Sequence, residues 1–301
     1  MKKKLLTAGV AFGIGGVMLL ASGYSAMANT SGYDAYKSAL KNLQAETSIS
    51  ENASLAVTDN GVKVFSGTAD IKVNHEQHAV SMAATIGDGS KSHSLNSYTQ
   101  DGKLIFKSGD SDVYQVMEHN APTWQHKSDA AVPAKSAEQV IDALMGNIRE
   151  LATVDNESDG SKQASLHLSG SQIPAIVNAL GSMAVSKMAG SDGWNHGNWH
   201  NADKSSIWPA DFHLSLPKLT DNIKVESIKL DANITPDNVL ARQTAEIGIS
   251  GSDSSGTKHD LVLQLRIDFS GFNQTTPEHI DLTGKQTVEI QNDGNKRGWH
   301  H

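Results

Sequence analysis

One stretch of the sequence combines imidazole with indole side chains. Residues 193–201 read GWNHGNWHN and contain His196 and His200. Imidazole nitrogens bind zinc, nickel and copper, so these two histidines form a candidate metal site. A structural zinc site needs four ligands, however, and glycine and asparagine disfavour the helix that would align the pair. The ordinary interpretation is an exposed loop, with metal binding as the alternative.

The tryptophans of this region suggest a second kind of site. An indole joins a large apolar surface to a single N–H donor, so it can stack on a sugar ring or lie at a lipid headgroup boundary. Trp194, Trp199 and the nearby Trp208 therefore form a candidate interaction loop for a cell-wall polymer or an exported protein. They can equally pack on the rim of a sheet, and the sequence does not separate these interpretations.

Two further polar stretches match ligand-binding motifs only in part. Residues 75–78 (HEQH) are one residue short of the zinc-protease motif, so their histidines cannot take the i and i+4 positions of a helix. We expect a polar hairpin loop there. Residues 155–160 (DNESDG) begin like a calcium loop, but position 12 would be Leu166, which has no oxygen to offer. A solvated loop between a helix and a strand is expected, with weak calcium binding as the alternative.

Enzyme motifs are not apparent. The chain contains neither G-x-S-x-G nor a phosphate-binding glycine loop, and its serines gather in Gly- and Asp-rich turns. It also has no cysteine, which excludes thiolate catalysis, disulfides and cysteine-based metal centres. We expect a non-enzymatic protein without a cofactor. Two buried carboxylates far apart in the sequence are the arrangement that such a motif search does not detect.

The first 28 residues have the three parts of a secretion signal. Lys2, Lys3 and Lys4 precede an apolar stretch over residues 5–21, and residues 26–28 (AMA) match the small-x-small cleavage pattern. The apolar stretch is short for a membrane span, which needs roughly twenty residues. We expect cleavage after Ala28 and a secreted, soluble protein of the extracytoplasmic cell envelope. Retention of the segment as an anchor is the alternative.

The remaining chain is acidic and long enough to fold around a large core. Subtracting the three signal lysines from the net charge of −8 gives −11, and no basic stripe is visible. We therefore expect no nucleic-acid partner, because phosphate binding depends on clustered Lys and Arg. A chain of this length buries on the order of 70 to 75% of its unfolded surface. We expect a monomer.

Hydrophobic periodicity predicts the order of elements. An amphipathic helix opens the mature chain, with Tyr33, Tyr36, Leu40 and Leu43 on one face. Residues 55–116 then alternate between apolar and polar types. Asn60-Gly61 is a type I′ hairpin signal, and Asp101-Gly102 indicates a further turn. Two mid-chain helices follow, over residues 136–151 and 173–184.

Strands return in the last third, most clearly over residues 261–269. One dry and one wet face are expected of such an antiparallel sheet, so we predict an α+β fold.

The order of these elements resembles the LolA/LppX-like lipoprotein-carrier superfamily. The resemblance lies in the exported start, the short helix, strands with Asp-Gly turns (YTQDGKLIFKSGDSDVYQV) and the closing run IKLDANITPDNVLARQTAEIGISGSDSSGTKHDLVLQLRIDFSGFN. It covers most of residues 33–282. It implies a strongly curved antiparallel sheet, a half-barrel, with helices on its concave face and an apolar groove for acyl chains. Tyr24 stands where related exported lipoproteins carry a lipid-accepting cysteine, so lipid anchoring there is excluded.

The leading hypothesis is therefore binding of a hydrophobic small molecule or lipid between sheet and helices. We expect a signal peptide over residues 1–28, a single domain over 29–285, and a C-terminal strand with a polar tail over 286–301. The candidate groove residues are the apolar positions of the two mid-chain helices: Ile141, Leu144, Ile148, Ile173, Ile176, Val177, Leu180 and Met183. Ordinary core packing of these side chains is the alternative.

Overall fold

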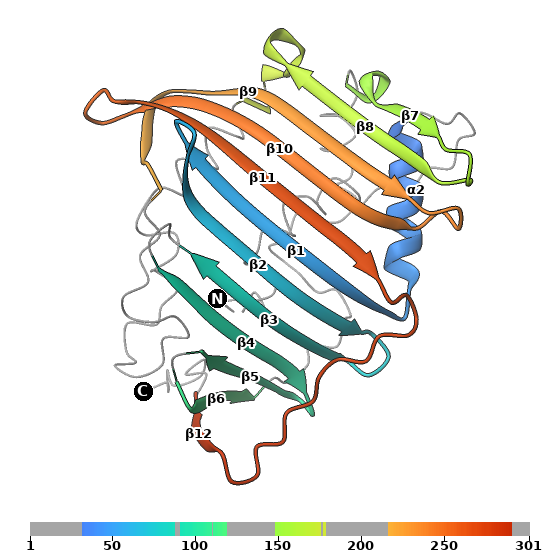
Figure 1. Ribbon diagram of the computed structural model, residues 1–301, viewed down its shortest axis with the longest axis vertical. Coiled ribbons are helices and arrows are strands. Elements are labelled where there is room, and N and C mark those ends of the chain that lie inside the picture. Colours follow the sequence, from blue (N-terminus) through green and yellow to red (C-terminus); the bar gives the residue numbers. More distant parts are fainter. Residues whose placement is uncertain are drawn as a thin grey trace, which may run out of the picture.

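The computed structural model describes residues 32–87, 91–109, 111–118, 148–175, 177–178 and 216–290. Within these ranges the chain forms one α-helix and twelve strands of a single sheet (Figure 1). The elements are α2 (Gly32–Ala45), β1 (Ser48–Asp59), β2 (Val62–Asn74), β3 (Ala79–Gly87), β4 (Ser92–Gln100), β5 (Lys103–Ser108), β6 (Val113–Glu118), η2 (Arg149–Leu151), β7 (Thr153–Asn156), β8 (Lys162–Ser169), η3 (Gly170–Gln172), β9 (Leu219–Ile234), β10 (Leu240–Asp253), β11 (Lys258–Ser270) and β12 (Gln286–Glu289). Among the described residues, none of the helices combines the length and the hydrophobicity of a membrane span.

The sheet joins two meanders along a central seam. Its strand order is β12-β6-β5-β4-β3-β2-β1-β11-β10-β9-β8-β7. Every neighbouring pair is antiparallel except β12 and β6, which are parallel. Strands β1 and β11 pair from Ser50 opposite Ser270 to Asp59 opposite Leu261, so segments from the two ends of the sequence lie side by side. The two predicted meanders are therefore halves of one layer.

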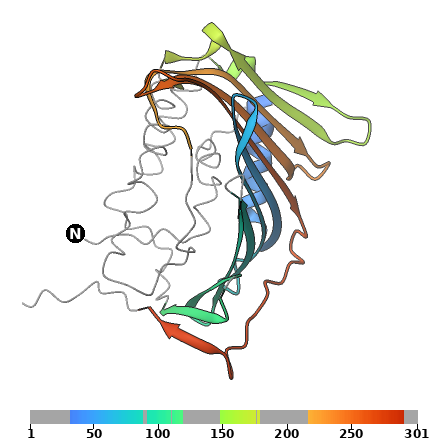
Figure 2. The same ribbon diagram turned by 60° about the vertical axis from the view of Figure 1, so that its left-hand side comes forward.

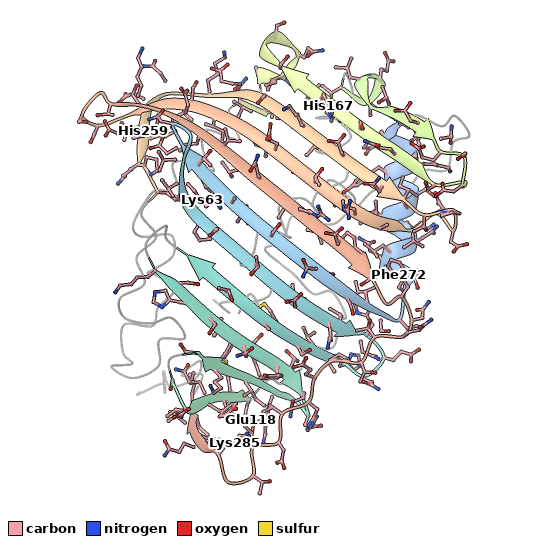
Figure 3. All side chains as sticks on the ribbon, viewed as in Figure 1. Lys63, Glu118, His167, His259, Phe272 and Lys285 are labelled. Carbon is pink, nitrogen blue, oxygen red and sulfur yellow. The ribbon has the colours of Figure 1, made fainter. Side chains whose placement is uncertain are left out.

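Strict alternation divides the sheet into two unlike faces. Leu55 of β1 lies opposite Leu265 of β11 on what we call the apolar face. The intervening Ser54 lies opposite Arg266 on the other side, the polar face. Figure 3 is viewed from the polar face, where charged and polar side chains such as His167 stand on the strands. The predicted dry and wet faces are thus confirmed, since adjacent side chains of a strand point to opposite sides.

The hairpin turns form where the sequence predicts them. Asn60 and Gly61 both have positive φ, at 49° and 80°, and so do Asp101 and Gly102, at 49° and 69°. Positive φ at both central positions is the geometry of a type I′ turn, which matches the twist of the flanking strands. Residues 75–78, the HEQH stretch, form the turn between β2 and β3, as expected.

Helix α2 packs on the apolar face, as Figure 2 shows, across strands β7 to β10. Its buried stripe contains Leu40 and Leu43, each only 2% exposed, which join a cluster with Ala53 of β1 and Phe269 of β11. Fully burying one leucine side chain stabilises a fold by about 1.5–3 kcal/mol. The predicted amphipathic helix is confirmed, and it is anchored by the face that its periodicity indicates.

The C-terminal segment crosses back over the polar face before it forms β12. Ile280 and Leu282 pack on a small cluster that contains Ile105 and Tyr114. The Gln100 side chain donates to the Ile280 carbonyl oxygen at 2.8 Å and accepts from the Ile280 amide at 2.9 Å. The Gln100 side chain therefore makes the two hydrogen bonds that the backbone of a neighbouring strand would make. These bonds fix the position of the returning segment relative to β4.

The fold departs from the predicted half-barrel. The described residues are mostly β with one α-helix, and the sheet is not strongly curled. Curling needs bulges repeated across the strands. Here β1–β11, β2–β3 and β3–β4 pair without a register shift, and shifts occur in the β1–β2 and β9–β10 pairs. The prediction of strong curvature is therefore wrong.

The two predicted mid-chain helices fall mostly outside the described residues. At the end of the first, the chain forms the 3-10 turn η2 at Arg149–Leu151. At the start of the second, Val177 and Asn178 donate their amides to the Pro174 carbonyl oxygen at 2.9 and 3.2 Å. This contact is a first helical turn, with proline at a position where its missing N–H costs nothing.

Candidate ligand site beneath helix α2

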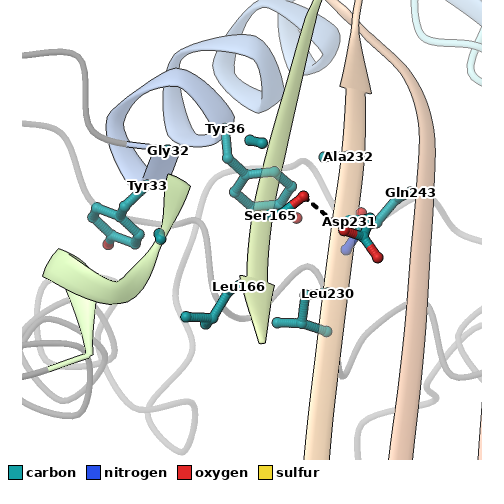
Figure 4. A pocket seen from close by; sticks show the side chains of 11 residues that line it. Gly32, Tyr33, Tyr36, Ser165, Leu166, Leu230, Asp231, Ala232 and Gln243 are labelled. Atoms are coloured by element: carbon teal, nitrogen blue, oxygen red, sulfur yellow. Dashed lines mark hydrogen bonds between the residues drawn. The ribbon is translucent and has the colours of Figure 1, made fainter. Parts of the chain in front are cut away.

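A cavity of about 50 Å³ lies between the N-terminal half of α2 and strands β8, β9 and β10. Figure 4 shows it from close by. Apolar side chains form most of its wall. The lining residues are Gly32, Tyr33, Tyr36, Ala152, Ala164, Ser165, Leu166, Leu230, Asp231, Ala232 and Gln243. Its apolar residues on β8 and β9 belong to the apolar face, so the cavity is a space left between helix and sheet.

The start of α2 is held unusually close to β7. The Gly32 amide donates to the Ala152 carbonyl oxygen at 3.2 Å. A Cβ atom on Gly32 would lie 1.9 Å from the Thr153 carbonyl oxygen and 2.5 Å from its carbon. These are backbone atoms that cannot rotate away. Glycine is therefore required here by close approach, and it sets the height of the helix above the sheet at one end of the cavity.

Charged groups hold η2 against the helix outside the cavity. Arg149 Nη2 donates to Asp34 Oδ1 at 2.6 Å. The same guanidinium lies 5.2 Å from the centre of the Tyr33 ring, within the range of a cation–π contact. Both arginine and aspartate are partly exposed, so the pair is worth little as a surface ion pair. The ion pair instead fixes the position of η2, and with it the position of Ala152 in the cavity wall.

Two polar side chains belong to the cavity itself. Gln243 is 6% exposed although it stands in the apolar register of β10, opposite Ile267 of β11 and Ala232 of β9. The Tyr36 hydroxyl approaches the Gln243 amide, and burial raises the pKa of Tyr36 to about 12, with the amide acting in the opposite direction. The phenol therefore stays protonated at any physiological pH and keeps a proton to donate.

The remaining polar lining residues face away from the cavity. Ser165 and Asp231 lie opposite each other on β8 and β9, at positions of the polar face. Ser165 Oγ donates to Asp231 Oδ1 at 2.7 Å, and His167 Nε2 lies 3.1 Å from the same oxygen. The one charged residue of the lining is thus satisfied on the far side of the sheet. The described lining of the cavity is therefore electrically neutral.

A buried acid stands elsewhere on the apolar face. Glu51 of β1 is 7% exposed and lies between Phe269 of β11 and Ile71 of β2. Burial raises its pKa to about 7. No hydrogen bond or ion pair offsets that burial within the described residues. At neutral pH the carboxyl is therefore divided between its charged and neutral forms.

Three of the eight predicted groove residues are described, and the fold brings them together. Ile148, Ile173 and the half-buried Val177 belong to one cluster with Leu166 and Leu168 of β8. Ile148 and Ile173 are each 5% exposed, which is ordinary core burial. They pack beside the cavity's strands without lining it. The other five, Ile141, Leu144, Ile176, Leu180 and Met183, lie outside the described residues, so the groove role stays a prediction.

The predicted loop and metal residues also lie outside the described ranges. These are Trp194, Trp199, Trp208, His196 and His200. Within the described residues, no three His, Cys, Asp or Glu side chains gather as metal ligands. The DNESDG stretch joins two strands, β7 and β8, rather than a helix and a strand, and Leu166 at its twelfth position is buried in the cavity wall.

No sequence motif marks the cavity residues of the sheet. The apolar alternation of β8 and β9 includes Ala164, Leu230 and Ala232. Such an alternation predicts a packed core and does not indicate a cavity within it. The usable signal is Gln243, a polar residue where the alternation of β10 demands an apolar one. Such a break marks a buried polar group that needs a partner.

Comparisons with known proteins assign no family. No family model and no curated protein matches the chain. A structure described as lipid–protein interactions in lipovitellin is 7% identical with a TM-score of 0.27, covering 78% of this chain and 26% of that one. The ywiB protein from Bacillus subtilis is 8% identical with a TM-score of 0.15, covering 76% and 97%. The chain thus spans about a quarter of the lipovitellin chain it matches. Similarity at this level assigns neither a fold family nor a function to this chain.

Proposed function

We propose that this protein is a secreted, non-enzymatic protein of the cell envelope that binds a hydrophobic ligand, a lipid or acyl chain, on the apolar face of its sheet. The observation that carries the proposal is the neutral cavity between α2 and strands β8 to β10, with its almost wholly apolar wall. Concave apolar sites with a few polar groups are the usual form of small-molecule sites. Membership of the lipoprotein-carrier superfamily is part of the same proposal.

The ligand extends beyond the cavity in this proposal. A space of about 50 Å³ holds only one end of such a ligand. Further along the apolar face lie half-buried side chains, Ile228 and Ile247 toward one side and Leu263 and Leu265 toward the seam. Each methylene that leaves water for such a surface contributes about 0.8 kcal/mol. A chain of roughly ten carbons therefore gains enough free energy to bind without a charged anchor.

A substitution that fills the cavity tests the proposal. Leu230 lines the cavity and is half-buried, so Leu230→Trp is expected to occupy the space and to weaken ligand binding at least about tenfold. The matched control is Thr244→Trp, which adds the same side chain on the polar face of the neighbouring strand. Binding is measured by displacement of an environment-sensitive apolar dye with lipid extracts and single acyl compounds, and by native mass spectrometry of the gently purified protein.

The outcomes separate the possibilities. Weaker binding in Leu230→Trp alone, with both variants folded by circular dichroism, supports the site. Equal binding by both variants places the ligand elsewhere. If the wild type carries no bound lipid and no compound displaces the dye, the proposal is overturned. Fractionation of the producing cells tests the export, since a cytosolic protein retaining residues 1–28 contradicts it.

A further inference from the structure

We propose that the cavity beneath α2 receives the uncharged polar end of an amphiphile, an alcohol or ester group, which hydrogen-bonds to the Tyr36 hydroxyl and the Gln243 amide. This inference rests on the proposed function and specifies the chemistry of its ligand. It concerns which headgroup the site accepts, whereas the proposed function concerns only the apolar tail.

The first step is the unmet hydrogen-bonding capacity of the two side chains. The Tyr36 hydroxyl is buried without a hydrogen bond of ordinary geometry. Gln243 is only 6% exposed. Apart from its approach to Tyr36, its side chain has no hydrogen-bond partner in the described part of the chain. An amide can make several hydrogen bonds as donor and acceptor. Buried polar groups are normally paired, and an unpaired one calls for an explanation such as a ligand or a water.

The second step is the direction in which these groups lie. Both residues line the cavity, Tyr36 from the helix and Gln243 from β10, so they meet the same space from opposite walls (Figure 4). The remaining walls are apolar or backbone, apart from the Ser165–Asp231 pair that is bonded on the polar face. Within the described part of the chain, a single polar group placed in this space therefore has Tyr36 and Gln243 as its available partners.

The third step is charge. No cationic residue is among the described residues that line the cavity, and Arg149, which lies near Tyr33, is bonded to Asp34. An ionised carboxylate or phosphate entering this neutral space would lose its hydration without gaining a counter-charge, which costs more than moving a neutral hydroxyl or ester. A protonated phenol and a carboxamide together offer donors and an acceptor. They complement an alcohol, which both donates and accepts, and an ester, which accepts.

The test compares ligands that share one tail length and differ in the head. Isothermal titration of the mature protein at about pH 8 uses decanol, decanoate and decane. We expect decanol to bind about tenfold more tightly than decanoate, because the carboxylate is ionised at that pH. Tyr36→Phe and Gln243→Leu are each expected to weaken decanol binding about two- to tenfold, the range of one neutral hydrogen bond, and to leave decane binding unchanged. Tyr114→Phe, on the opposite face, is the control.

Each other result counts against a defined part of the idea. Equal affinity for decanol and decanoate overturns the headgroup inference and leaves the proposed function standing. If decanol binds equally well to both cavity variants, Tyr36 and Gln243 bind a buried water and not the ligand. That result also overturns the inference. If none of the three compounds binds, the inference and the proposed function fall together.

Discussion

At the scale of single residues, the informative positions are polar groups placed where the sheet demands apolar ones. Gln243 and Glu51 both stand on the apolar face and are both buried. Burying a polar group without a full set of partners costs free energy, so such positions are expected where they serve a ligand or a switch. Gln243 borders a cavity, whereas Glu51 lies between apolar side chains of its neighbouring strands.

Glu51 makes the stability of the fold depend on pH. Its pKa is raised from 4.5 to about 7 in the folded protein, so between these values the folded state holds a proton that the unfolded state has lost. This group's effect is therefore to lower stability as pH rises from about 4.5 to 7, with no further change above that range. In Glu51→Gln that loss is absent, and the variant should exceed the wild type by about 2–4 kcal/mol at pH 8.

Urea unfolding of both proteins between about pH 4 and pH 8 measures this difference. The two free energies of unfolding should converge near pH 4, where Glu51 is neutral in both states. Asp70→Asn is a suitable control, because Asp70 lies on the exposed polar side of β2, where its carboxylate accepts from Asn52. A constant difference across the pH range would show that Glu51 does not titrate as its burial indicates.

At the scale of elements, the separation of α2 from the sheet decides whether a cavity exists. The helix is amphipathic and buries Leu40 and Leu43, which anchors its C-terminal half. Its N-terminal end approaches the backbone of β7 at Gly32. Between these two points the side chains of Tyr33 and Tyr36 face the small residues Ala164 and Ala232 of the sheet. The alanine side chains are too short to fill the gap between helix and sheet, and the cavity remains.

Gly32→Ala tests this arrangement. The added Cβ would lie 1.9 Å from the Thr153 carbonyl oxygen, so α2 must move away from β7. We expect a loss of about 1–3 kcal/mol in the free energy of unfolding, as in other overpacked sites, together with weaker ligand binding. The control is Gly248→Ala, where the nearest atom is the rotatable Ser227 Oγ at 2.6 Å. Chemical denaturation and dye displacement measure the two effects, and equal behaviour of both variants contradicts the proposed contact.

At the scale of the whole molecule, one wide sheet keeps its two faces distinct across its central strands, whereas near the β12 edge the returning C-terminal segment buries apolar side chains on the polar face. The apolar face holds the core and the candidate site, and the polar face carries interactions such as the ion pair between Lys229 Nζ and Glu246 Oε1, at 2.7 Å. That pair is exposed and contributes little to stability. Burial on the apolar face therefore supplies most of the favourable free energy of folding.

A pair of neighbouring substitutions measures this asymmetry. Ala53 is 3% exposed on the apolar face at the centre of the sheet, whereas Ser54 beside it lies on the polar face opposite Arg266. Ala53→Asp buries an unpaired charge, and we expect it to lower the free energy of unfolding by about 3 kcal/mol or more. Ser54→Asp should change it by about 0.5 kcal/mol or less. Similar losses from both variants, in thermal or urea unfolding, would mean that Ser54 is buried as well.

The sequence by itself determined the local structure of this protein. Asn60-Gly61 and Asp101-Gly102 predict their turns because few residues accept positive φ, and the alternation over residues 261–269 predicts a one-sided strand because neighbouring side chains point to opposite faces. Only the tertiary structure decided how far the sheet bends and where space is left beneath α2. Curvature depends on the register between strands distant in sequence, and the cavity depends on the sizes of Tyr36, Ala164 and Ala232 once they meet. Neither quantity is a property of any one segment, so no local pattern encodes it.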